Sequence, residues 1–159
     1  MRIRLAVCLF LGLASASCNK TEPSVSAPTE SIWKEFTSTS DGFAISMPTM
    51  PDLTSQDNQY DFGKVVIRSY MSNPRRNVAW QVATHNYPDE FASQITSEVL
   101  IELMRNGMAE NIKGKVEGVK EVSLDGHTGQ EFLVQAHEPI SNKPSTCKVR
   151  LFKVGSRVY

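Results

Sequence analysis

Apolar and polar residues alternate along several short stretches of the chain, which is typical of strands with one buried face. Turn-forming residues separate neighbouring stretches, as at Ser40-Asp41-Gly42, at 73–77 and at Asp125-Gly126. The polar stretch 52–60 is predicted to be a loop, and 64–71 and 78–87 are predicted to form a hairpin. The stretches predicted as strands are 32–37, 42–47, 64–71, 78–87, 115–124, 130–136 and 146–154.

The period changes between Asp89 and Ile112, where apolar residues recur at intervals of three and four. This spacing predicts one long amphipathic helix with Pro88 just before it and Gly114 just after it. Gly107 should weaken its last turns by about 1 kcal/mol relative to Ala, so a bend or an end is expected there. The expected fold class is therefore α+β: an antiparallel β-sheet packed against one long amphipathic helix. The apolar positions are Phe91, Ile95, Val99, Leu103, Met104, Met108 and Ile112.

The last residues resemble an incomplete hairpin. Gly155-Ser156 is a two-residue turn, but only Arg157, Val158 and Tyr159 follow it, whereas a returning strand usually has about five or six residues. We expect either a truncated chain or an unusually short edge strand.

Residues 1–17 have the pattern of an export signal. Arg2 and Arg4 give a positive start, residues 5–13 are an apolar stretch too short to span a bilayer, and residues 14–17 are small. The division expected is a signal peptide at 1–17, a lipid attachment site with a tether at 18–30, and one domain at 31–159.

Cys18 follows the small residues directly, which is the arrangement that a lipoprotein signal peptidase uses. We therefore predict that Cys18 is lipidated and anchors the protein to a membrane. The position three before it is Ser15 rather than an aliphatic residue. Ala14-Ser15-Ala16 is also an A-x-A site for ordinary signal peptidase, so simple secretion or a periplasmic location stays open.

Residues 19–30 are rich in Thr, Ser, Pro, Glu and Ala and have no apolar period. Such a composition predicts a flexible tether, which a domain held at a membrane surface requires. Asn19, rather than Asp, at the second mature position favours the outer membrane if the host has one. The expected location is the cell envelope.

Charge and cysteine content exclude some functions. The chain has 17 Lys and Arg and 17 Asp and Glu, so without Arg2 and Arg4 the mature chain has 15 basic and 17 acidic residues. That balance argues against nucleic acid as a partner. If Cys18 is acylated and Cys8 is removed, Cys147 is the single free thiol; otherwise a Cys18–Cys147 disulfide stays open.

Four motifs follow one another along the predicted domain: Trp33-x-x-Phe36, Gly42-Phe43-x-Ile45-x-Met47-Pro48, Gly126-x-x-Gly129-x-Glu131 and Arg150-Leu151-Phe152-x-Val154-Gly155-x-Arg157-Val158-Tyr159. With the order of elements, they resemble the bacterial branch of the PsbP-like fold, named for an extrinsic subunit of photosystem II. The resemblance covers about residues 32–159 and rests mainly on strand and turn patterns. It implies an interaction or assembly domain rather than an enzyme, and it carries over no metal or photosystem-binding residues.

Candidate chemistry is sparse. His85, His127 and His137 have no metal-ligand spacing, and we predict neither a metal nor another cofactor. The expected function is a non-catalytic, lipid-anchored domain that binds an envelope protein or a small ligand. The alternative is a small exported enzyme that uses Glu131 with His127 or Cys147, and it requires those side chains to converge in one pocket.

Overall fold

The computed structural model describes residues 3–5, 33–75, 77–138 and 142–159. Cys18, the predicted tether and nearly all of the predicted signal peptide lie outside these ranges. From the amino-terminal segment, only strand β1 (Ile3–Leu5) is described, and it pairs in parallel with β3.

The domain is mostly β, so the predicted α+β class with one long helix packed on a sheet is wrong. Strands make up 61% of the described residues and helices 17%. Seven strands form one antiparallel sheet in the order β4-β5-β6-β10-β9-β8-β7, and a smaller sheet has the order β1-β3-β2. The remaining strands are β2 (Lys34–Ser38), β3 (Phe43–Met47), β4 (Asp52–Tyr60), β5 (Gly63–Arg75), β6 (Val78–Asn86), β7 (Lys115–Leu124), β8 (His127–His137), β9 (Pro144–Val154) and β10 (Arg157–Val158).

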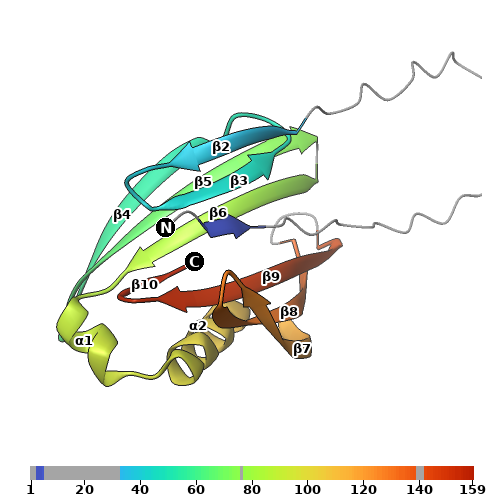
Figure 1. Ribbon diagram of the computed structural model, residues 1–159. Coiled ribbons are helices and arrows are strands. Elements are labelled where there is room, and N and C mark those ends of the chain that lie inside the picture. Colours follow the sequence, from blue (N-terminus) through green and yellow to red (C-terminus); the bar gives the residue numbers. More distant parts are fainter. Residues whose placement is uncertain (1–2, 6–32, 76, 139–141) are drawn as a thin grey trace, which may run out of the picture.

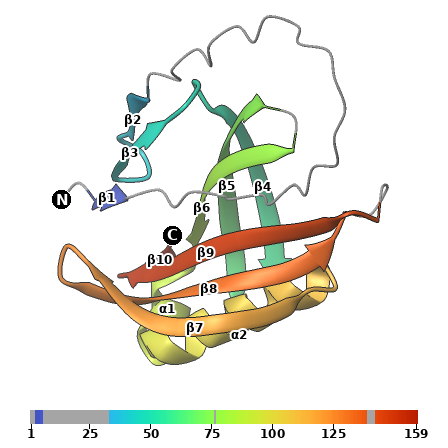
Figure 2. The ribbon, with the colours of Figure 1, turned by 90° about the vertical axis from the view of Figure 1, so that its right-hand side faces the viewer.

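The seven-stranded sheet has two halves that run in different directions (Figures 1 and 2). Strand β10 joins them, because it pairs with β6 on one side and with β9 on the other. Val158 is fully buried, and the Tyr159 and Phe152 backbones exchange hydrogen bonds of 2.9 and 3.0 Å. The expected short strand exists, but it lies in the middle of the sheet rather than at an edge.

Strand β4 corrects a second expectation, since residues 52–60 were predicted to be a loop. All nine residues pair with β5, from Asp52 opposite Met71 to Tyr60 opposite Gly63. The strand lies at one edge of the sheet, and most of its side chains are exposed. A strand with both faces in water has no apolar alternation, so its sequence resembles that of a loop.

The predicted helix is divided into α1 (Asp89–Gln94) and α2 (Ser97–Asn111). Ile95 and Thr96 are extended, and the Thr96 hydroxyl accepts a 3.4 Å hydrogen bond from the Val99 amide. Thr96 is thus an N-cap that begins a new helix. Gly107 does not end α2, which continues to Asn111.

Two separate cores hold the domain together. In the first, the β2–β3 hairpin packs on β5, β6 and Tyr159. In the second, α2 packs on β8 and β9 through Ile101 and Ala109, which meet Phe132, Val134 and Leu151. The two cores lie on opposite faces of the large sheet, and Figure 2 shows the hairpin on one side and α2 on the other. The hairpin covers the face of the sheet that points away from α2. The face of β4, β5 and β6 that points toward α2 therefore has no hairpin over it.

Candidate functional site: an apolar groove beside helix α2

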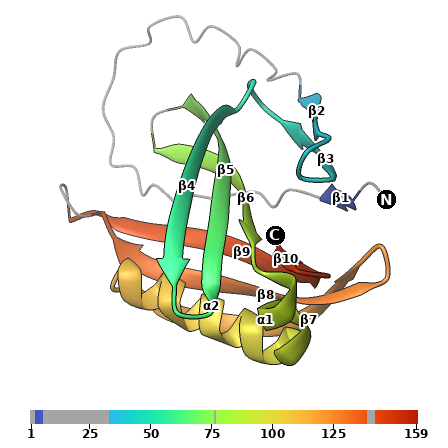
Figure 3. The same cartoon turned by 90° about the vertical axis from the view of Figure 1, so that its left-hand side faces the viewer.

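A groove of about 640 Å³ lies between α2 and the half-sheet formed by β4, β5 and β6. The turn between β4 and β5 lies at one end of it, in front of α2 in Figure 3, and Phe62 in this turn contacts Phe91 of α1. Its volume is within the range of about 300–1,000 Å³ that is typical of small-molecule sites.

The groove lining is apolar and carries no acidic or basic side chain other than His85. Alternation along β5 directs Val65 and Ile67 into the groove, whereas Tyr70 points into the core on the opposite face. The α2 wall consists of Leu100, Leu103, Met104, Gly107, Met108, Asn111 and Ile112, and the remaining lining residues are Asn58, Tyr60, Phe62, His85, Tyr87 and Phe91.

Aromatic rings form one end of the groove. Phe62 stacks on Phe91 with ring centroids 4.0 Å apart, and Tyr60 stacks on Phe62 at 5.0 Å. Tyr87 completes the cluster, 5.6 Å from Phe91. Tyr60 and Phe62 nevertheless remain 46% and 40% exposed. An aromatic cluster that is packed internally but still exposed is typical of a binding surface.

His85 on β6 is the one titratable imidazole in the groove lining. Burial lowers its pKa below the ordinary value of 6.5, because desolvation disfavours the charged ring. The imidazole is therefore uncharged at neutral pH, and the groove as a whole is electrically neutral.

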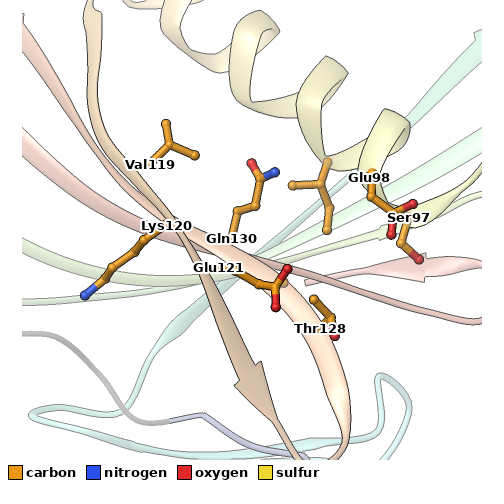
Figure 4. A pocket seen from close by; sticks show the side chains of 9 residues that line it. Ser97, Glu98, Val119, Lys120, Glu121, Thr128 and Gln130 are labelled. Carbon is orange, nitrogen blue, oxygen red and sulfur yellow. The ribbon is translucent and has the colours of Figure 1, made fainter.

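A second hollow of about 140 Å³ lies between the start of α2 and strands β7 and β8. Figure 4 shows Glu98 and Glu121 directed toward it, whereas Lys120 points away. Lys120 lies on the opposite face of the sheet, where its amine is 2.9 Å from Glu131. The hollow is too small for an ordinary ligand site, so the apolar groove is the better candidate.

Glu131, one of the candidate catalytic residues, is almost fully buried beneath three cations. Its carboxylate oxygens lie 2.9 Å from Lys120, 3.1 Å from Lys148 and 2.6 Å from Arg150. Burial alone would raise the pKa of Glu131, but hydrogen bonds from these cations outweigh it and lower the pKa to about 2. A carboxylate held ionised in this way is poorly suited to exchange protons near neutral pH.

The three predicted catalytic side chains do not converge. Cys147 packs on the α2 side of β9, whereas Glu131 faces the other side of the sheet. His127 shares the Glu131 face but lies four residues away, which is about 13 Å along a strand. Burial also raises the pKa of the Cys147 thiol, so the reactive thiolate is disfavoured.

Within residues 3–5, 33–75, 77–138 and 142–159, no cluster of three or more His, Cys, Asp or Glu side chains could hold a metal ion. Neither helix of this described part is long and apolar enough to cross a membrane.

Comparison with known proteins finds no matching family model, no matching curated protein and no matching solved structure. The resemblance to the PsbP-like fold therefore stays a sequence-based prediction. The groove itself was not anticipated, although five of its lining residues belong to the apolar stripe between residues 89 and 112. The missing signal was the strand character of 52–60, which brings Tyr60 and Phe62 to the aromatic cluster with Tyr87 and Phe91.

Proposed function

We propose that this protein is an exported, lipid-anchored binding protein of the cell envelope that holds an apolar ligand in the groove beside α2. The observation that carries the proposal is the groove itself: about 640 Å³, exposed to solvent and lined without ionised side chains. Apolar surface of this extent gains free energy when a ligand covers it, at about 25 cal/mol for each Å² removed from water.

The export signal and Cys18 support the cellular part of the proposal. A lipidated Cys18 would hold the domain beside a membrane, and residues 19–30 would separate the two. Intact mass of the protein extracted from membranes tests this part. We expect a chain that starts at Cys18 and carries acyl groups, and a Cys18→Ser variant without them. An unmodified wild-type chain starting at Ser17 would contradict lipid anchoring.

Two leucines allow a matched test of the binding part. Leu103 is 57% exposed at the groove, and Leu53 is 56% exposed on the opposite face of β4. An uncharged fluorescent dye, Nile red, should bind the full chain with a blue shift of its emission. Leu103→Asp should weaken this binding about tenfold, since it places a carboxylate in the groove, whereas Leu53→Asp should not. Equal dye affinity in both variants would contradict binding in the groove.

A further inference from the structure

The groove's dimensions restrict what it can hold. Its α2 wall runs from Leu100 to Ile112, which corresponds to about 18 Å at about 1.5 Å per residue. A bilayer's hydrocarbon core is about 30 Å thick, so one acyl chain in one leaflet extends over about 15 Å. The groove is therefore long enough to take one extended acyl chain along α2.

The lining argues against an extended peptide as the occupant. An extended peptide would bring backbone amides and carbonyls against Val65, Ile67 and Leu100, which offer no side-chain hydrogen bonds. A hydrocarbon chain has no such requirement.

Gly107 widens the groove in the middle of its helical wall. A Cβ atom at this position would have no other atom within 4 Å, although glycine costs a helix about 1 kcal/mol relative to alanine. Met104 and Met108 flank it, and their unbranched side chains adapt to irregular apolar surfaces. The wall thus has an open central position between two adaptable residues.

We infer that the groove binds a single acyl chain of a membrane lipid, extended along α2 and passing over Gly107. The inference rests on the proposed binding function and deepens it by naming the ligand class. The chain belongs to a separate lipid, so binding should persist when Cys18 carries no acyl groups of its own. The uncharged lining selects the hydrocarbon part of the lipid and leaves its headgroup in solvent.

Uncharged monoacylglycerols of increasing chain length test the inference on the full-length Cys18→Ser protein, with displacement of Nile red as the readout. Affinity should rise about fourfold for each methylene that is buried. The rise should stop when the chain reaches about 15–18 Å. Affinity that is independent of chain length, while Nile red still binds at Leu103, would overturn the inference but leave the proposed function standing. Failure of Nile red itself would contradict the proposed function.

Two substitutions at Gly107, one large and one small, form a matched pair of variants that tests whether the acyl chain passes over this position. Gly107→Phe fills the open position and should weaken monoacylglycerol binding at least about tenfold, whereas Gly107→Ala should preserve it. Both variants should unfold cooperatively, with a midpoint temperature at least as high as that of the wild type, since each substitution raises helix propensity. Equal binding by both variants would overturn the inference.

A second variant covers the case in which Gly107→Phe does not fold. Ile112 is 38% exposed at the end of the groove. Ile112→Asp should shorten the chain length at which affinity stops rising, because a charge then closes that end. An unchanged length limit would overturn the proposed orientation along α2.

Discussion

Arg68 on β5 donates a 2.8 Å hydrogen bond to the carboxylate of Asp41, which lies fully buried in the turn between β2 and β3. Tyr70 and Ser38 donate to the other carboxylate oxygen, and the Tyr159 hydroxyl donates to the Asp41 carbonyl at 2.7 Å. Burial alone would raise the pKa of Asp41, but the hydrogen bonds from Tyr70 and Arg68 and the charges of Arg68 and Arg157 lower it. One residue thus connects the small hairpin, the large sheet and Tyr159.

Asp41→Asn should destabilise the fold by about 2–4 kcal/mol, because it leaves Arg68 and Tyr70 without their charged acceptor. Urea denaturation measures the change. Asp57→Asn is the control, since the Asp57–Lys64 ion pair is more than half exposed and should contribute at most about 1 kcal/mol. Equal losses in the two variants would show that the Asp41 network is not a structural connection.

The Glu131 cluster predicts a pH dependence of stability. Its folded pKa of about 2 lies below the ordinary value of 4.5, so its contribution is complete above about pH 4.5 and is lost as pH falls toward 2. Glu131→Gln should destabilise the protein at pH 7 by about 2–3 kcal/mol, since three cations lose their acceptor. The difference from the wild type should shrink toward pH 2, as acid titration at several urea concentrations would show. If the difference in unfolding free energy between Glu131→Gln and the wild type does not change with pH, the lowered pKa of Glu131 is contradicted.

Two Gly→Ala substitutions should change the stability of the protein in opposite directions. At Gly129 on β8, a Cβ atom would overlap the Leu151 carbonyl oxygen and the Phe152 ring, so Gly129→Ala should cost at least about 2 kcal/mol. At Gly107 no atom lies within 4 Å, so Gly107→Ala should stabilise α2 by about 0.5–1 kcal/mol. Thermal unfolding of both variants checks the signs, and destabilisation by Gly107→Ala would contradict the open position in the groove.

The sequence predicted those strands whose one face is buried. Strands β6, β8 and β9 alternate apolar and polar residues, because one side of each packs on a core, whereas β5 is rich in β-branched and aromatic residues. Strand β4 was missed since it has no buried face, and its nine residues are strand only through pairing with β5. Pairing across a sheet depends on a partner that local sequence does not reveal.

The helical region shows a second limit of prediction from sequence. An apolar period that continues through Ile95 and Val99 predicts one helix, but Thr96 caps a new one and shifts the buried face to Leu100 and Ile101. Val99 and Leu103 are about half exposed as a result. Periodicity alone thus found most of the helical residues that border the groove but missed the buried Leu100 and Ile101.

The capping role of Thr96 can be tested directly. Thr96→Ala should remove the hydrogen bond to the Val99 amide and cost about 1 kcal/mol, whereas Thr96→Ser keeps a hydroxyl and should cost much less. Far-ultraviolet circular dichroism during thermal unfolding measures both. If the two variants lose the same stability, Thr96 does not act as the N-cap of α2.

The His85 imidazole lines the groove, so its titration can reveal whether a ligand is bound there. Because burial lowers its pKa below 6.5, the ring should titrate below that value in an NMR pH titration, with His85→Gln used to assign the signal. An acyl chain in the groove would displace water and lower the pKa further. By linkage, protonation of His85 should weaken chain binding as pH falls through that pKa. A monoacylglycerol that saturates the protein without shifting the His85 titration would have to bind elsewhere, and Gly107→Phe, which blocks the groove, should abolish the shift.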